Sequence, residues 1–213
     1  MRIATLLTLC TLAAGCCTLC ADGSDGFVSL FDGRTLNGWK VSEENPGSFS
    51  VEDGAIKAAG PRAHLFYDGS VADHNFKNFH LKARVMARPN SNSGLYFHTQ
   101  YQAEAWPSKG YECQINNTHK DRKKTGGLYA IQDVMDNSPA KDNEWFDYDI
   151  IVTGKHIVLM IDGKKTVDYT EPDNPERPKG MADRLISSGT FAIQAHDPKS
   201  VVFVKDIRVK PLP

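Results

Sequence analysis

Polar side chains recur at every second position in three segments that otherwise have the alternation of β-strands. Every second residue of a strand points to the same face, so each segment has one polar face. If the three strands are neighbours, their amide, imidazole and carboxylate groups form one surface. The residues on these faces are Asn92, Gly94, Tyr96, His98 and Gln100 in the first segment, Glu112, Gln114 and Asn116 in the second, and Gln194 and His196 in the third.

Such a surface has the chemistry of a carbohydrate site. Planar amides and carboxylates hydrogen-bond the hydroxyl groups of a sugar, and aromatic rings stack on its apolar faces. The aromatic residues available for stacking are Tyr96, Tyr101, Trp106, Tyr129 and Trp145. Carboxylate and imidazole groups also transfer protons near neutral pH. The pattern therefore predicts sugar binding, and by itself leaves open whether catalysis follows.

Several other functions are disfavoured by what the sequence contains. The chain has 25 basic and 26 acidic residues and a net charge of −1, whereas a dedicated nucleic-acid binder usually has a clear basic excess. Its 40% content of hydrophobic residues is typical of a folded protein rather than a disordered one. The sequence has no nucleophile elbow, no zinc-protease motif, no phosphate-binding glycine loop and no paired-cysteine zinc pattern.

The elements that must position these side chains are predicted to be β-strands. Alternation predicts strands over residues 79–88, 111–116, 146–152, 156–161, 164–169, 190–196 and 201–209. Asp162-Gly163 lies between two of them and predicts a hairpin turn. Three prolines predict a loop over residues 171–179, and the charged residues 119–124 predict another. Many short strands separated by turns predict an all-β sandwich of antiparallel strands.

The first 21 residues have the pattern of a secretory signal peptide. One positive charge at Arg2 precedes an apolar run over residues 3–12, and small residues follow. The run is shorter than the roughly 20 residues of a membrane span. The remainder, 22–213, is predicted to be a single domain. We expect an exported protein, periplasmic or secreted; the alternative is an envelope protein with a lipid anchor at Cys16, because Ala13-Ala14-Gly15-Cys16 is similar to a lipoprotein signal.

Cysteine positions exclude a disulfide framework for the predicted domain. Four of the five cysteines, at positions 10, 16, 17 and 20, lie in or beside the predicted signal peptide. Cys113 alone remains, and a single cysteine forms no internal disulfide. We therefore expect the domain to be stabilised by its hydrophobic core.

Ordered sequence blocks along residues 27–212 give the chain a family resemblance. The blocks are LFDGRTLNGW (30–39), NSGLYF (92–97), GYECQI (110–115), TGGLY (125–129), NEW (143–145), IQAH (193–196) and FVKDIRV (203–209). In this order they resemble the 3-keto-disaccharide hydrolase domain family. The resemblance implies a concanavalin A-like (LamG-like) jelly-roll β-sandwich. It also implies cleavage of glycosides that are already oxidised to a ketone at C3 of the sugar.

That chemistry suggests roles for the polar residues. A ketone at C3 acidifies the hydrogen on C2, a base removes it, and the enolate expels the C1 substituent before water adds back. As a hypothesis, Glu112 or His98 is the base and His196 is its acid partner. Asn92 and Gln114 orient the sugar. Tyr96, Tyr129 and Gln194 are further substrate-binding candidates. No cofactor is assigned; the same His and Glu groups are of types that bind a divalent cation, but their spacing establishes none.

Two alternatives to an enzyme remain open at this point. A non-catalytic carbohydrate-binding module with the same fold would bind an intact glycan and form no product, since fold alone does not determine function. An envelope structural or adhesion domain would have neither a perturbed carboxylate nor a concave polar surface. No nucleic-acid partner and no membrane span are expected.

Overall fold

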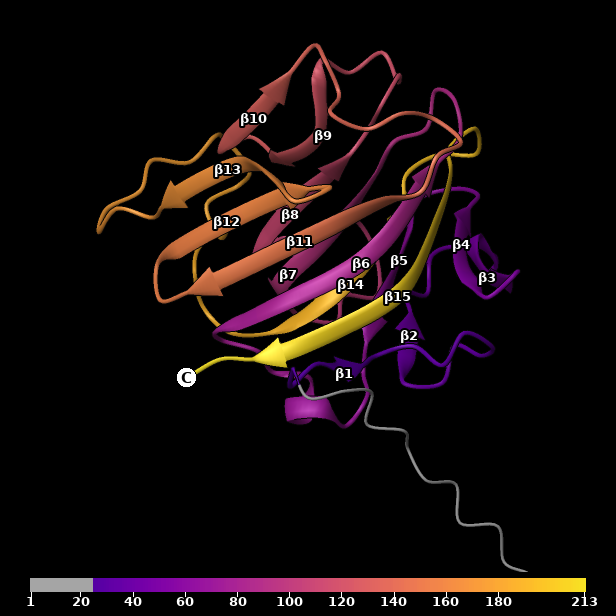
Figure 1. The fold of residues 1–213 in the computed structure, drawn as a ribbon, viewed down its shortest axis with the longest axis horizontal. Helices are drawn as coiled ribbons and strands as arrows, with labels where there is room; N and C mark the ends of the chain where they lie inside the picture. Colours follow the sequence, from indigo (N-terminus) through magenta and orange to yellow (C-terminus); the bar gives the residue numbers. More distant parts are fainter. Residues whose placement is uncertain (1–24) are drawn as a thin grey trace, which may run out of the picture.

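Two antiparallel β-sheets lie face to face in the computed structural model, which describes residues 25–213 (Figure 1). This arrangement confirms the predicted all-β sandwich. The predicted signal peptide and Cys16 lie outside the described residues. Among those residues, no helix has the length and hydropathy needed to span a membrane.

One sheet, called sheet A here, has the strand order β13-β12-β11-β6-β15-β4-β3, and β1 pairs with β15. Its strands are β1 (Val28–Ser29), β3 (Phe49–Glu52), β4 (Ala55–Ala59), β6 (Phe79–Ala87), β11 (Phe146–Thr153), β12 (His156–Ile161), β13 (Lys164–Thr170) and β15 (Val201–Pro211). Alternation in β6 and β11 puts apolar side chains inside and polar ones outside, as predicted. Asp162 and Gly163 form the predicted hairpin turn, and both have positive φ, 48° and 71°.

The other sheet, called sheet B here, has the order β10-β9-β8-β7-β14-β5-β2. Its strands are β2 (Trp39–Val41), β5 (Ala63–Tyr67), β7 (Ser93–Thr99), β8 (Tyr111–Ile115), β9 (Lys123–Leu128), β10 (Gln132–Met135) and β14 (Thr190–Ala195). The three segments with polar faces are β8, β7 and β14, which are consecutive neighbours. The loop predicted over residues 119–124 is corrected at its end, because β9 begins at Lys123.

The hydrophobic core lies between the two sheets. Leu95 and Ile115 from sheet B pack in the same cluster as Val85 and Ile150 from sheet A. Each fully buried aliphatic side chain of this kind contributes about 1.5–3 kcal/mol relative to an exposed one. Cys113 is also in this core as a free thiol, and burial raises its pKa well above the usual value.

An irregular segment of 19 residues connects the edge of sheet A to the centre of sheet B. This segment, called the long loop here, comprises residues 171–189 between β13 and β14 and contains neither helix nor strand. It includes the loop predicted from the three prolines. The backbone nitrogen of Gly110, just before β8, donates a hydrogen bond to the Asp183 oxygen of the long loop at 3.2 Å. The long loop is therefore attached beside the polar faces of sheet B.

Candidate functional site

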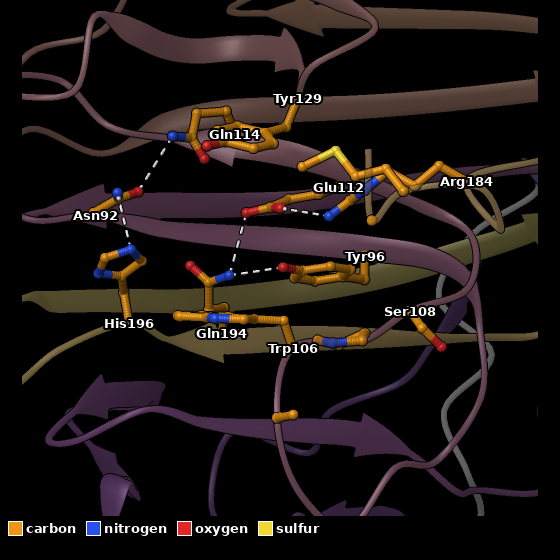
Figure 2. A pocket seen from close by; sticks show the side chains of 14 residues that line it. Asn92, Tyr96, Trp106, Ser108, Glu112, Gln114, Tyr129, Arg184, Gln194 and His196 are labelled. Carbon is orange, nitrogen blue, oxygen red and sulfur yellow. Dashed lines mark hydrogen bonds and ion pairs between the residues drawn. The ribbon is translucent and has the colours of Figure 1, made fainter. Parts of the chain in front are cut away.

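A cleft of about 500 Å³ lies on the outer face of sheet B (Figure 2). Its floor comes from β7, β8 and β14, and its walls come from residues 105–108 and the long loop. The lining residues are Asn92, Tyr96, Ala105, Trp106, Pro107, Ser108, Glu112, Gln114, Tyr129, Gly180, Met181, Arg184, Gln194 and His196. The cleft contains carboxylate, imidazole and amide groups as well as aromatic surface.

Strand register explains why the polar side chains share this face. Tyr96 is paired opposite Glu112, and Gly94 opposite Gln114, in the β7–β8 ladder. A Cβ atom on Gly94 would lie 2.8 Å from both Cγ and Oε1 of Glu112, which is too close for a real contact. Glycine at this position therefore gives the Glu112 side chain the space it occupies over β7.

Glu112 is a buried carboxylate with two hydrogen-bond partners in the cleft (Figure 2). Nη2 of Arg184 donates to its Oε2 at 3.2 Å, and Nε2 of Gln194 donates to its Oε1 at 3.2 Å. The same Gln194 nitrogen donates to the Tyr96 hydroxyl at 2.7 Å. Burial raises the pKa of Glu112, although the Arg184 charge opposes the increase. A carboxyl group with a raised pKa on a cleft floor is suited to proton transfer near neutral pH.

His196 and Asp197 form a carboxylate–imidazole pair at the other end of the cleft. Nδ1 of His196 lies 2.9 Å from Oδ2 of Asp197. Burial raises the pKa of Asp197, but hydrogen bonds from Ser200 and His196 outweigh it and lower the pKa to about 2. Asp197 is thus ionised at neutral pH and holds the proton on Nδ1. Nε2 of His196 then accepts from Nδ2 of Asn92 at 3.3 Å.

Polar atoms without a partner mark the floor of the cleft. Nε2 of Gln114 donates to Oδ1 of Asn92 at 3.2 Å, which joins the β7 and β8 residues. Among the described residues, Oε1 of Gln114, Oε1 of Gln194 and Nη1 of Arg184 are buried and have no hydrogen-bond partner. Buried polar atoms are normally paired, so two acceptors and one donor are available for a polar ligand.

Trp106 supplies an aromatic wall. Its side chain is 41% exposed, and its ring centroid lies 5.3 Å from that of His196 and 5.6 Å from that of His64. The Arg62 guanidinium lies 5.1 Å from the ring centroid on its face. Burial lowers the pKa of His64 to about 3, so this imidazole is neutral at physiological pH. Trp106 is therefore held among polar groups while part of its ring remains open to a ligand.

Most of the residues predicted from the sequence converge in this cleft. The structure brings together Glu112, His196, Asn92, Gln114, Tyr96, Tyr129 and Gln194. Tyr129 extends from the end of β9, and Lys123 lies over its ring at 4.2 Å. The roles assigned to these seven residues remain predictions.

His98 is not in the cleft, and its expected placement is wrong. Its φ of +54° interrupts the alternation of β7, so the ring leaves the face of Tyr96. Nε2 lies 2.9 Å from the Lys77 oxygen, and Nδ1 accepts from the Ser187 nitrogen at 3.3 Å. The ring packs edge-on against Phe79, and burial lowers the pKa of His98. Its position is that of a neutral structural imidazole.

Arg184 and Asp197 are the residues that the sequence interpretation missed. Arg184 lies in an irregular loop 72 positions after Glu112, and no periodic pattern identifies such a residue. Asp197 directly follows His196, and this adjacency was a usable signal for a carboxylate–imidazole pair.

Within residues 25–213, no group of three or more His, Cys, Asp or Glu side chains is placed to hold a metal ion.

Comparison with known proteins identifies the family of this chain. Residues 26–210 match the family described as the 3-keto-alpha-glucoside-1,2-lyase-like domain. A relative from Bacteroides thetaiotaomicron named 3-keto-disaccharide hydrolase is 35% identical over 175 residues, which are 68% of this chain and 59% of the relative. This chain thus spans less than two thirds of that protein's length.

Solved structures with low sequence identity show the same fold. A candidate glycosyl hydrolase from Parabacteroides distasonis has a TM-score of 0.74 at 22% identity, covering 88% of this chain and 94% of the other. The carbohydrate-binding module CBM66 from Bacillus subtilis has a TM-score of 0.55 at 11% identity, covering 81% of this chain and 95% of the other. The match over nearly all described residues places the chain in the 3-keto-disaccharide hydrolase and 3-keto-alpha-glucoside-1,2-lyase-like domain family.

Proposed function

We propose that this protein cleaves 3-keto-glycosides, with 3-keto-disaccharides as substrates, by elimination across C1 and C2 followed by addition of water. The observation that carries the proposal is the buried Glu112, whose pKa is raised, in a cleft shared with the His196–Asp197 pair. The name of the Bacteroides relative supports the substrate class.

Proton removal is the first step of the proposed reaction. Ionised Glu112 takes the hydrogen from C2, and the electron pair of that bond moves toward the C3 ketone to form an enolate. The free Nη1 of Arg184 is a buried cationic donor close to this carboxylate, so it can stabilise the developing negative oxygen. Burial makes such stabilisation stronger than it would be in water.

Departure of the C1 substituent is the second step. The enolate collapses, the C1–O bond breaks with its electron pair going to oxygen, and a double bond forms between C1 and C2. In its protonated form His196 donates from Nε2 the proton that the leaving oxygen needs, while ionised Asp197 holds Nδ1 and orients the ring. Water then adds across the double bond, with hydroxyl to C1 and hydrogen to C2. Glu112 releases its proton to solvent and His196 takes one up, so both groups are regenerated and the net reaction is hydrolysis.

The remaining cleft residues bind and orient the sugar. Asn92, Gln114 and Gln194 supply amide groups on the floor, and Trp106 and Tyr129 supply aromatic surface at the sides. Amides recognise hydroxyl groups, and rings cover the apolar face of a pyranose.

Product analysis tests this proposal directly. Purified protein is incubated with a 3-keto-disaccharide and, in parallel, with its unoxidised parent, and the release of monosaccharide is followed by chromatography. We expect release from the keto sugar alone. In D₂O, elimination and hydration place deuterium at C2 of the product, whereas direct hydrolysis does not; the isolated product, incubated alone, controls for later exchange. No release from either sugar would refute the proposed activity.

A non-catalytic carbohydrate-binding module is the second candidate, because the fold is shared with CBM66. It predicts binding of an intact glycan without product, and Glu112→Gln would then change affinity alone. The envelope structural or adhesion domain predicts neither a perturbed carboxylate nor a concave polar surface. Glu112 and the cleft provide both features, so we do not propose that function.

A further inference from the structure

A second buried ion pair lies within the long loop, outside the cleft. Nη2 of Arg177 donates to Oε2 of Glu171 at 2.9 Å, and the two side chains are 6% and 8% exposed. The Tyr111 hydroxyl donates to the same carboxylate oxygen and accepts from Arg177 Nη2 at 2.8 Å. Glu171 directly follows β13, whereas Tyr111 begins β8. This cluster therefore connects the long loop to the strand that carries Glu112.

Arg177 also holds the backbone of the residue that pairs with Glu112. Its Nε donates to the backbone oxygen of Arg184 at 2.6 Å, while the side chain of Arg184 reaches Glu112 at 3.2 Å. One guanidinium therefore binds Glu171 through Nη2 and the Arg184 backbone through Nε. The rigid fork of arginine donors makes both contacts from two separate nitrogens, whereas the three donors of a lysine sit on one nitrogen and do not reproduce this geometry.

The positions on either side of Arg184 are attached to the same framework. The Asp183 oxygen accepts from the Gly110 nitrogen at 3.2 Å, and the Ile186 nitrogen donates to Oε2 of Glu171 at 3.0 Å. The Ser187 nitrogen donates to Nδ1 of His98 at 3.3 Å. Residues 183, 184, 186 and 187 thus each have a backbone hydrogen bond to a group outside the 183–187 segment. In a loop without regular structure, these contacts determine where Arg184 lies.

We propose that Arg177 and Glu171 are positioning residues for the reaction, which hold the long loop so that the guanidinium of Arg184 meets Glu112 and the cleft. This inference rests on the proposed function for its kinetic consequences. Replacing a buried ion pair by apolar residues is often neutral for stability, so overall stability alone does not explain this one. A displacement of about 1 Å at a reacting group reduces a rate by about 100-fold, which makes positioning valuable.

Arg177→Lys is the variant that separates positioning from stability. Lysine keeps a positive charge beside Glu171 but lacks the second nitrogen by which Arg177 holds the Arg184 backbone. We expect kcat on a 3-keto-disaccharide to fall by about 10-fold or more, with KM within about threefold of the wild-type value. Arg122→Lys is the matched control, because Arg122 also uses Nε and Nη2, at 2.7 and 2.9 Å, but binds the exposed Asp136. It should retain the wild-type kcat.

A double-mutant cycle shows whether Arg177 acts through Arg184. If it does, adding Arg177→Lys to Arg184→Ala should not lower kcat further, so the double variant should have the same kcat as Arg184→Ala. Independent effects would multiply and would overturn the proposal. If Arg177→Lys does not fold, the double variant Glu171→Gln with Arg177→Met removes both charges together and enters the same cycle.

Titration of Glu112 supplies a readout that does not need turnover. Its carboxyl carbon, observed by NMR in ¹³C-glutamate-labelled protein and assigned with Glu112→Gln, reports the contact with Arg184. The titratable or charged groups that interact with Glu112 are Arg184, Tyr96, Tyr129, Tyr148 and Cys113. Of these, Arg184 alone is held by Arg177.

Loss of the Arg184 contact removes a positive charge that favours the carboxylate, so the titration midpoint of Glu112 should rise in Arg177→Lys, as in Arg184→Ala. A midpoint unchanged in Arg177→Lys but raised in Arg184→Ala would overturn the positioning role. If wild-type protein does not cleave the keto sugar, the proposed function fails, and the titration still decides the positioning role.

Discussion

Arg184 and Glu112 form an ion pair on the cleft floor, with Nη2 and Oε2 3.2 Å apart and both side chains more than nine-tenths buried. The two residues come from different kinds of structure, an irregular loop and a central strand. Breaking such a pair leaves one charge buried without compensation, which typically costs several kcal/mol. The pair therefore connects the stability of the site to its chemistry.

Arg184→Met should reduce both activity and stability. It removes the cationic donor proposed to stabilise the enolate, and we expect kcat on a 3-keto-disaccharide to fall by about 100-fold or more. The melting temperature should also fall at neutral pH, because Glu112 is then buried alone. Arg184→Lys keeps the charge but not the fork of donors, so its kcat and melting temperature should lie between those of Arg184→Met and the wild type. Kinetics and thermal unfolding of both variants check this, and an unchanged kcat in Arg184→Met would remove Arg184 from the mechanism.

The pH profile of the reaction should contain the ionisation of Glu112. A base must be deprotonated, so kcat/KM rises with pH through the pKa of Glu112. Burial raises that pKa, so the acid limb should lie above the usual glutamate value of about 4.3. Glu112→Gln should lack this limb and lose at least about 100-fold in kcat. A limb that persists in Glu112→Gln would assign the titration to another group.

Asp197→Asn should impair the proposed proton transfer by His196 without changing the shape of the cleft. Asparagine fits the space but no longer fixes the proton on Nδ1, so the imidazole loses its orientation. We expect kcat to fall by about 100-fold with little change in KM. Steady-state kinetics measure both constants. A loss confined to KM would show that Asp197 serves substrate binding instead.

Acid should weaken the folded protein partly through the same carboxylate. The pKa of Asp197 is about 2 in the folded state, below the value of about 3.9 expected when unfolded. A lowered folded pKa stabilises the protein above the unfolded pKa, and that contribution is lost as pH falls from about 4 toward 2. Urea unfolding at several pH values should show a shallower loss over this window in Asp197→Asn than in the wild type.

The alternation of polar and apolar residues in the strands predicted most of the fold and much of the site. Glu112 and Gln114 are two residues apart on β8, so their side chains point to the same face of the strand. Gln194 lies on the polar face predicted for β14. The polar faces of these strands were therefore predictable without coordinates. What alternation assumes is uniform extended backbone. At His98 the backbone turns to φ +54°, and the prediction fails there because the face of every later side chain changes.

Loop residues escaped prediction for a different reason. Arg184 reaches the cleft because Arg177 binds its backbone oxygen and Glu171 binds the backbone nitrogen of nearby Ile186, and such contacts leave no local signal in the sequence. Trp106 was named as one of several available rings, and nothing in its sequence neighbourhood indicated that it lines the cleft. The geometry of a regular strand can be predicted from its local sequence pattern, whereas the geometry of an irregular loop depends on its tertiary contacts.

His98→Gln should leave the chemistry intact. Glutamine can donate to the Lys77 oxygen and accept from the Ser187 nitrogen, the two contacts that the imidazole makes. We expect kcat within about threefold of the wild type and an unchanged pH profile, with any effect confined to thermal stability. A general base would instead contribute about 100- to 10,000-fold. A loss of that size in His98→Gln would restore His98 as a catalytic candidate.

Trp106→Ala tests whether the exposed ring binds sugar. The indole packs against His196 on one side and lies under the Arg62 guanidinium, so its removal takes aromatic surface from the cleft wall while Glu112 and Arg184 stay in place. An aromatic contact is worth about 0.5–1.5 kcal/mol beyond its burial, which corresponds to about 3- to 10-fold in KM. Trp106→Phe should recover most of the loss, and ligand should change tryptophan fluorescence in the wild type but much less in Trp106→Phe. Equal KM values in all three proteins would show that the sugar binds without a contribution from this ring.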